Sequence, residues 1–209
     1  MIIPVETLTI FFAASLALAI APGPDNIFVL TQSVVRGRAA GLLATAGICT
    51  GLLVHTTAVS LGIAVIFKTS VLAFNMLKIL GASYLLYLAW LAFRAGASNL
   101  QQDGNSGTGA RGLYVRGIMM SVTNPKLAIF FMAFLPQFAD PTRGSLTLQI
   151  IVFGAVFILV TLIVFISIAW GAGFLGDWLK GSMRAQLILN RIAGTVFASL
   201  AIRLVMVEQ

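Results

Sequence analysis

Long apolar stretches recur along this chain and restrict what it can fold into. Ala39–Phe67 and Ser145–Gly176 contain no acidic residue, lysine or arginine, and Gly117–Ala139 contains only Lys126. A helix needs about 20 mostly apolar residues to cross a bilayer, whereas a transmembrane β-barrel would show shorter segments of alternating polarity. Since 59% of the residues are hydrophobic and only 9% are charged, the sequence predicts an all-α, polytopic helical membrane protein.

We expect six spans, of which the first is broken. The last span is the weakest, because Arg191 and Arg203 leave a short uncharged centre and must reach the two interfaces. Five spans with a surface helix are therefore the alternative, and the third span begins either at Val71 or near Lys78. The expected spans are Val5–Val35, Ala39–Phe67, Val71–Phe93, Leu113–Leu135, Ser145–Ala172 and Leu187–Val207.

Basic residues are unevenly divided between alternate loops, and this division predicts the orientation. Lysine and arginine mark the cytoplasmic loops of membrane proteins, so we expect the first, third and fifth loops in the cytoplasm and both termini outside. Those loops hold Arg36, Arg38, Arg94, Arg111, Arg116, Lys180 and Arg184, against Lys68, Arg143 and Arg203 on the other side. Such scattered placement also argues against a nucleic-acid partner, despite a net charge of +7.

One linker divides the chain into two parts. Residues 96–112 are rich in glycine, serine, glutamine and asparagine, which predicts a flexible cytoplasmic segment. We expect a single transmembrane transporter domain over residues 1–209, composed of halves 1–95 and 113–209. Three spans in each half give the halves opposite orientations, as in transporters that contain inverted repeats.

Each half is interrupted in its first span. Pro22-Gly23-Pro24 breaks one, because proline lacks a backbone N–H and clashes with the preceding turn. Asn124-Pro125 breaks the other. Paired interruptions at corresponding places in two halves are the best sequence indication of a transporter's substrate site.

The two breaks carry the clearest charges inside the apolar segments. Asp25 precedes Arg36 by eleven positions and Lys126 follows Arg116 by ten, so at about 1.5 Å per residue both lie roughly 15 Å from the cytoplasmic edge. Each charge alone would cost about 2.5–3.5 kcal/mol at a bilayer centre. Pairing of the two charges, or a cavity that contains water, would relieve much of that cost.

This placement favours recognition of an amino-acid zwitterion. Asp25 would bind the ammonium group, and Lys126 with the helix N-termini would bind the carboxylate. Alternatively, Asp25 and Lys126 form a structural ion pair that never contacts substrate. The candidate substrate-binding residues are Pro22, Gly23, Pro24, Asp25, Asn26, Asn124, Pro125 and Lys126.

The residues at each break also fit the start of a new helix. Pro24 suits the first helical position, with Asp25 and Asn26 in the opening turn, and Asn124 suits an N-cap followed by Pro125. Both half-helices would then direct free backbone N–H groups and a positive dipole end toward the middle of the membrane.

The second expected span has two distinct faces and the only histidine. A small face, Gly47, Gly51, Ala58 and Gly62, is expected to pack closely against a neighbouring helix. A polar stripe, Thr45, Cys49, Thr56 and Ser60, either lines a pathway or bonds its own backbone carbonyls. His55, with an unperturbed pKa near 6.5, is a candidate for proton coupling beside Asp25. An ordinary interhelical hydrogen bond is the alternative role for His55.

The chemistry of several other protein classes is missing. Cys49 is the only cysteine, which excludes intramolecular disulfides, two-cysteine relays and thiolate-rich metal sites. A protease would need a nucleophile with its base, or two carboxylates, so we predict no enzyme, no metal site and no cofactor. A metal or inorganic-cation exporter is the alternative function, but it would require several converging ligands.

Several motifs together resemble the lysine-exporter (LysE-type) superfamily, and within it the homoserine/threonine-resistance (RhtB-type) amino-acid exporters. They occur in order at family-like spacing up to the end of the fourth span, and the last two spans match only in hydropathy. The motifs are Ala21-Pro22-Gly23-Pro24-Asp25-Asn26, Arg36-Gly37 with Ala40-Gly41-Leu42, Gly47 through Gly51 to His55, Leu77-Lys78, Gly81-Ala82, Tyr84-Leu85, Thr123-Asn124-Pro125-Lys126, Phe130-Phe131 and Leu135-Pro136-Gln137-Phe138.

The resemblance implies a bacterial inner-membrane exporter of amino acids or their derivatives, driven by the proton-motive force. With the expected orientation, both termini would be periplasmic. The implied partners are a small amino-acid substrate, protons and the lipid bilayer, and a homodimer is left open. The motifs do not assign the substrate side chain.

Overall fold

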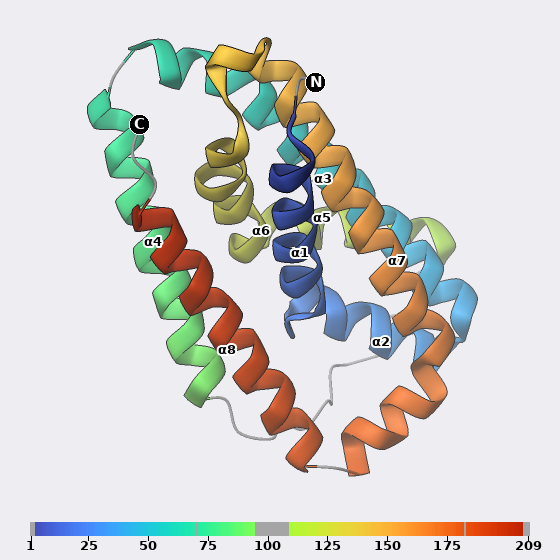
Figure 1. The fold of residues 1–209 in the computed structure, drawn as a ribbon. Coiled ribbons are helices and arrows are strands. Elements are labelled where there is room, and N and C mark those ends of the chain that lie inside the picture. Colours follow the sequence, from blue (N-terminus) through green and yellow to red (C-terminus); the bar gives the residue numbers. More distant parts are fainter. Residues whose placement is uncertain (1–2, 70, 95–108, 182, 207–209) are drawn as a thin grey trace.

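The computed structural model describes residues 3–69, 71–94, 109–181 and 183–206, and every regular element in these ranges is a helix (Figure 1). This confirms the all-α class. The elements are α1 Val5–Ile20, α2 Pro24–Arg36, α3 Arg38–Thr69, α4 Val71–Arg94, α5 Ala110–Thr123, α6 Pro125–Ile129, the π-helix η1 Phe130–Phe134, the 3₁₀ turns η2 Leu135–Phe138 and η3 Pro141–Arg143, α7 Leu146–Gly181 and α8 Met183–Met206.

Helix length and hydropathy support a multi-pass arrangement. Among the described residues, α3 over Arg38–Gly62 and α7 over Leu146–Ala172 are long and apolar enough to cross a membrane alone. The pair α1 and α2, bent by 57°, and the pair of α5 with the segment Pro125–Phe138, bent by 50°, each pass the same test when taken together. The other expected spans correspond to α4 and α8, which lie against each other on one side of the molecule (Figure 1).

The structure corrects some expected boundaries. Residues 96–108 of the expected linker lie outside the described residues, and its last part belongs to α5, which begins at Ala110 rather than Leu113. Alanine and arginine favour helix, so the helix extends into the linker. α7 continues to Gly181 rather than ending at Ala172, since no proline follows Pro141 to stop it.

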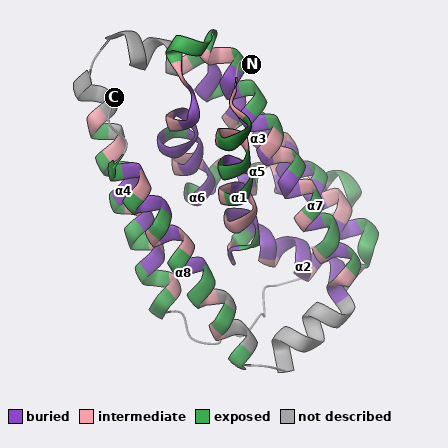
Figure 2. Ribbon diagram, in the orientation of Figure 1, coloured by how far each residue is buried: buried purple, intermediate pink, exposed green. Residues whose placement is uncertain are grey.

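Phenylalanine rings hold the broken segments in place. Phe11 of α1 lies 4.7 Å from Phe153 of α7, and Phe130 of η1 lies 5.0 Å from Phe157 of α7, between ring centroids. Such aromatic pairs contribute about 0.5–1.5 kcal/mol each beyond burial of area. Figure 2 shows α2 and α6 largely buried, while α4 and α8 expose their outer faces. The rings of this cluster are Phe11, Phe130, Phe131, Phe134, Phe138, Phe153 and Phe157.

The prediction that the small face of the second span packs closely against a neighbour is correct for half of that face. A Cβ on Gly117 of α5 would lie 2.6 Å from the carbonyl oxygen of Ala44 and 3.1 Å from the Cα of Gly47, so α3 and α5 meet backbone to backbone. Gly51 similarly lies against Ser121 of α5. A Cβ on Gly62, in contrast, would meet nothing within 4 Å. Close packing therefore involves the first half of this face only.

The expected polar stripe of this span bonds its own helix. The hydroxyls of Thr45, Thr56 and Ser60 donate to the backbone carbonyls of Gly41, Leu52 and Thr57, respectively. These residues are therefore satisfied without a ligand, in agreement with the simpler alternative.

Gly117→Ala should lower the melting temperature of the purified protein, and Gly62→Ala should not. The first adds a methyl where there is no room, at a cost of about 1–3 kcal/mol. The second removes a flexible residue from an open helix position and should be neutral or stabilising by about 0.5–1 kcal/mol. Equal melting temperatures for the two variants would show that the α3–α5 contact is looser than described.

Candidate functional site

The first break begins where α1 ends at Ile20 and closes where α2 begins at Pro24. Gly23 is extended, with φ −162° and ψ 174°, and Pro24 has no N–H to donate backwards. Carbonyls at the end of α1 therefore lose their helical partners. The side chain of Asn26 donates to the Ala19 carbonyl at 2.7 Å, which satisfies one of them.

The second break is capped as the sequence predicts. Asn124 lies between α5 and α6, and its side-chain oxygen accepts from the backbone N–H of Lys126 at 3.0 Å, with Pro125 at the first helical position. The Ala128 N–H bonds the Asn124 carbonyl. One N–H group expected to be free, that of Lys126, is thus bonded by the Asn124 side chain, whereas no side chain caps the start of α2.

Asp25 and Lys126 meet between the two breaks. The ammonium nitrogen of Lys126 lies 3.3 Å from the Oδ1 atom of Asp25 and 3.3 Å from the carbonyl oxygen of Ala21. Both charged residues are buried, at 2% and 5% exposure. Hydrogen bonds between such ions are usually about 2.7–2.9 Å long, so this pair is loosely held.

Gly23 passes directly over this ion pair. A Cβ at Gly23 would lie 2.7 Å from the Asp25 Oδ1 and 2.8 Å from the Lys126 nitrogen. Only glycine leaves the carboxylate and the ammonium group this close to the loop.

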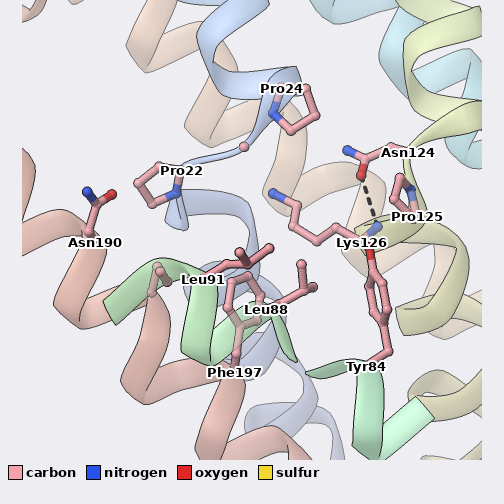
Figure 3. Close-up of a pocket in the computed structure, with 13 residues that line it drawn as sticks. Pro22, Pro24, Tyr84, Leu88, Leu91, Asn124, Pro125, Lys126, Asn190 and Phe197 are labelled. Atoms are coloured by element: carbon pink, nitrogen blue, oxygen red, sulfur yellow. Dashed lines mark hydrogen bonds between the residues drawn. The ribbon is translucent and has the colours of Figure 1, made fainter. Parts of the chain in front are cut away.

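A cavity of about 270 Å³ opens beside the two breaks (Figure 3). Most of the candidate residues line it: Pro22, Gly23, Pro24, Asn124, Pro125 and Lys126. Asp25 and Asn26 are not part of the lining; Asp25 faces the Lys126 ammonium behind Gly23, and Asn26 bonds α1. Both breaks thus line one cavity, and Asp25 lies behind the residues that line it.

The opposite wall comes from α4 and α8, which motif reasoning did not assign to the site. Its lining is mostly apolar, apart from a hydroxyl and an amide; in Figure 3 the Tyr84 ring points toward the Asn124–Lys126 segment. Tyr84 and Asn190, polar residues in these two spans, were the available sequence signals. The wall consists of Tyr84, Leu88, Leu91, Ala92, Asn190, Ala193 and Phe197.

One polar atom of the lining is a ready donor. The Asn124 side-chain nitrogen is buried and has no hydrogen-bond partner among the described residues. Its orientation is fixed, because the oxygen of the same amide already accepts from Lys126. An unsatisfied buried donor costs about 1–3 kcal/mol, which a bound acceptor would recover.

His55 does not line the cavity. Its Nε2 atom lies 3.1 Å from the Ser121 carbonyl oxygen, and its ring stacks on Phe131 at 5.5 Å. A carbonyl only accepts, so Nε2 is the donor of this hydrogen bond. His55 therefore lies next to the second break rather than at the ion pair, because Ser121 precedes Asn124 by three residues.

One further observation bears on the alternative function of a metal or inorganic-cation exporter. The described part of the chain contains no group of three or more His, Cys, Asp or Glu side chains that is suited to a metal ion. A cation exporter thus finds no supporting cluster there.

Comparison with known proteins decides the family. The family model described as "LysE type translocator" matches residues 16–208. The chain belongs to this family. Homoserine/homoserine lactone efflux proteins of Salmonella typhimurium and Salmonella typhi are each 33% identical over 188 residues, 90% of both chains. A leucine efflux protein of Salmonella choleraesuis is 28% identical over 200 residues, 93% of this chain and 92% of its own length.

Membership in this family confirms the resemblance of the sequence motifs to LysE-type exporters. It makes this LysE-type chain a multi-pass transporter and not an enzyme. No solved structure matches it significantly.

Asp25→Asn or Lys126→Gln alone should destabilise the protein strongly, and the double variant should recover most of the loss. Removal of one partner leaves the other charge buried and unpaired, which costs about 3–5 kcal/mol. Thermal melting of the purified variants in detergent measures this. Single variants that melt like the wild type would show that water or lipid headgroups, and not the partner, neutralise each charge.

Proposed function

We propose that this LysE-type translocator exports small amino acids or their derivatives from the bacterial cytoplasm in exchange for protons. The observation that carries the proposal is the cavity between two broken helices, with the Asp25–Lys126 pair beside it. Intramembrane charges are retained at a cost and mark substrate or ion pathways. The relatives named for homoserine, homoserine lactone and leucine efflux support the substrate class.

The cavity offers a partner for each part of a neutral amino acid. Asp25 provides an anion for the ammonium group, while Lys126 and the unpartnered amide nitrogen of Asn124 provide donors for the carboxylate. The apolar side chain would lie against Leu88 and Phe197. The cavity volume of about 270 Å³ is just below the usual range of ligand pockets, about 300–1,000 Å³, so the cavity fits a small solute.

Two inverted three-helix halves would supply the alternating access. Helix contacts support this arrangement: α3 contacts α5 and α7, α7 contacts α1 and α3, and α4 contacts α8. Exchange of α1 with α5, α3 with α7 and α4 with α8 leaves these four contacts unchanged, whereas the close contacts of α2 with α3 and α7 have only small counterparts in the segment Pro125–Phe138. Rocking of one half against the other would then expose a site at the two breaks to each side in turn.

The proposed orientation places loops one, three and five, including the linker 96–112, in the cytoplasm and both termini in the periplasm. Arginine and aromatic residues agree with it: Arg38 lies over the Trp170 ring and Arg94 over the Trp90 ring, as at a membrane interface. On the opposite side, Asp140 pairs with Arg143 at 3.0 Å. Hydrogen bonds from Thr142 hold the pKa of Asp140 below its usual value, so that this pair remains charged and contributes no net positive charge.

Proton coupling would supply the energy. A potential of 100 mV provides about 2.3 kcal/mol per charge, which sustains a gradient of roughly 50-fold for one proton. Asp25 is the proposed proton carrier, because the substrate ammonium and a proton compete for the same carboxylate. His55, bonded next to the second break, is proposed to assist transfer.

Inverted membrane vesicles test the transport proposal. Energised vesicles that contain the wild type should accumulate labelled leucine or homoserine, and a protonophore should abolish accumulation. Asp25→Asn should abolish it, whereas His55→Ala should slow it; Gly62→Ala, at an open position away from the cavity, is the control.

Accumulation that survives the protonophore would refute proton coupling. Accumulation of neither amino acid by well-folded wild type would refute export of this substrate class.

Cysteine labelling of intact cells tests the orientation. In a Cys49→Ala background, Ser145→Cys should react with an impermeant thiol reagent added outside, and Gly109→Cys should react only after lysis. A Cβ at Gly109 meets nothing within 4 Å, so the substitution is tolerated. The reverse pattern would invert the proposed topology.

A further inference from the structure

The ammonium group of Lys126 occupies a site that the first break creates. Ala21 lies just past the end of α1, where the interruption removes the helical partner of its carbonyl, and that oxygen is 3.3 Å from the Lys126 nitrogen. The Asp25 carboxylate, from the first turn of α2, lies at the same distance. A backbone carbonyl and a carboxylate that converge on one point form an acceptor pair for any primary ammonium group.

Two residues of the cavity lining lie between this acceptor pair and the cavity: Gly23, which has no side chain, and Lys126 itself. Gly23 and Lys126 both line the cavity, while Asp25 lies behind them. A methyl group at Gly23 would lie within 2.8 Å of both ions. In Figure 3 the Lys126 side chain extends from the wall of the cavity toward the loop that contains Pro22 and Pro24.

Lys126 would gain an alternative partner, the substrate carboxylate, when a zwitterion enters the cavity. Its two contacts are long for charged hydrogen bonds, and its flexible stem carries a rotatable charge. The Asn124 amide nitrogen lines the same cavity without a partner in the described part of the chain.

We propose, on the basis of the amino-acid export function above, that Lys126 is a tethered competitor for the substrate's ammonium site. When the cavity is empty, the lysine ammonium is bound by Asp25 and the Ala21 carbonyl. When a zwitterion binds, its ammonium replaces that of Lys126, which turns to the substrate carboxylate beside Asn124. The exchange breaks one ion pair and forms two.

Charge balance then sets a preference within the ligand class, which for two relatives named above includes homoserine lactone, an amine without a carboxylate. A zwitterion leaves every charge in the site paired. An amine without a carboxylate, such as leucinamide, displaces Lys126 but leaves it buried without an anion. Wild-type protein should therefore discriminate against amines, although their ammonium group is the same.

Removal of the lysine should reverse this preference. In Lys126→Met, leucinamide pairs with Asp25 and leaves no unpaired charge, whereas leucine introduces a carboxylate without a partner. The test measures the melting temperature of the purified full-length protein over a range of leucine and leucinamide concentrations, with homoserine and its lactone as a second pair.

The proposal predicts that wild type binds leucine at least about tenfold more tightly than leucinamide, a difference of about 1.4 kcal/mol. Lys126→Met should prefer leucinamide by a similar factor. Asp25→Asn/Lys126→Met should respond to neither, and Lys78→Met, a lysine of α4 outside the cavity lining, should keep the wild-type preference.

Lys126→Met that fails to prefer leucinamide would overturn the proposal, as would leucinamide binding to the double variant. Should Lys126→Met be unstable after purification, extraction in leucinamide must restore it, because the amine replaces the lost lysine; failure to do so also counts against the proposal. Wild type that transports leucine while Lys126→Met ignores leucinamide would refute the competitor role alone. Wild type that neither binds nor transports leucine or homoserine would refute the proposed function.

Discussion

The structure depends on how backbone carbonyls are satisfied at an interruption inside a membrane-spanning helix. In hydrocarbon, water is not present to replace a lost partner, and irregular backbone is tolerated only where protein or a cavity covers it. Here the carbonyls freed at the end of α1 are bonded by Asn26, from the next helix, and by Lys126, from the other half of the chain. A side chain from the break in one half thus satisfies a backbone carbonyl that is freed at the break in the other half.

This hydrogen bonding between the two breaks explains the position of the cavity. Asn124 caps its own half-helix and thereby starts Lys126 on the side that faces the first break. The phenylalanine cluster fixes the segment after Lys126 against α1 and α7. α4 and α8 lie against each other and form the wall opposite the breaks, and the space left between this wall and the breaks is the cavity.

Sequence alone could predict those features that follow from neighbouring residues or from the depth of a residue in the membrane. Two prolines around Gly23, an N-cap followed by Pro125, and equal depth for Asp25 and Lys126 identified both breaks and their pairing. The apolar part of the cavity wall in α4 and α8 was not predictable, because residues such as Leu88 and Phe197 look the same whether they face lipid, a neighbour or a cavity. The position of Asp25 behind Gly23 depends on the path of a three-residue loop, which no periodicity determines.

Electrical neutrality imposes a condition on how such a site can work. The empty site, with Asp25 paired to Lys126, and the site loaded with a zwitterion both have no net charge, so both are suited to an apolar surrounding. A proton on Asp25 instead leaves Lys126 positive, and this state responds to the membrane potential. In the proposed antiport the inward step must therefore carry the proton, while outward export carries no net charge.

An empty paired site that reoriented freely would allow export without protons, so tight coupling requires the Asp25–Lys126 pair to hold the two halves together until substrate or a proton separates it. A loose pair that joins both breaks meets that requirement, because either ligand can compete for Asp25 and release the connection.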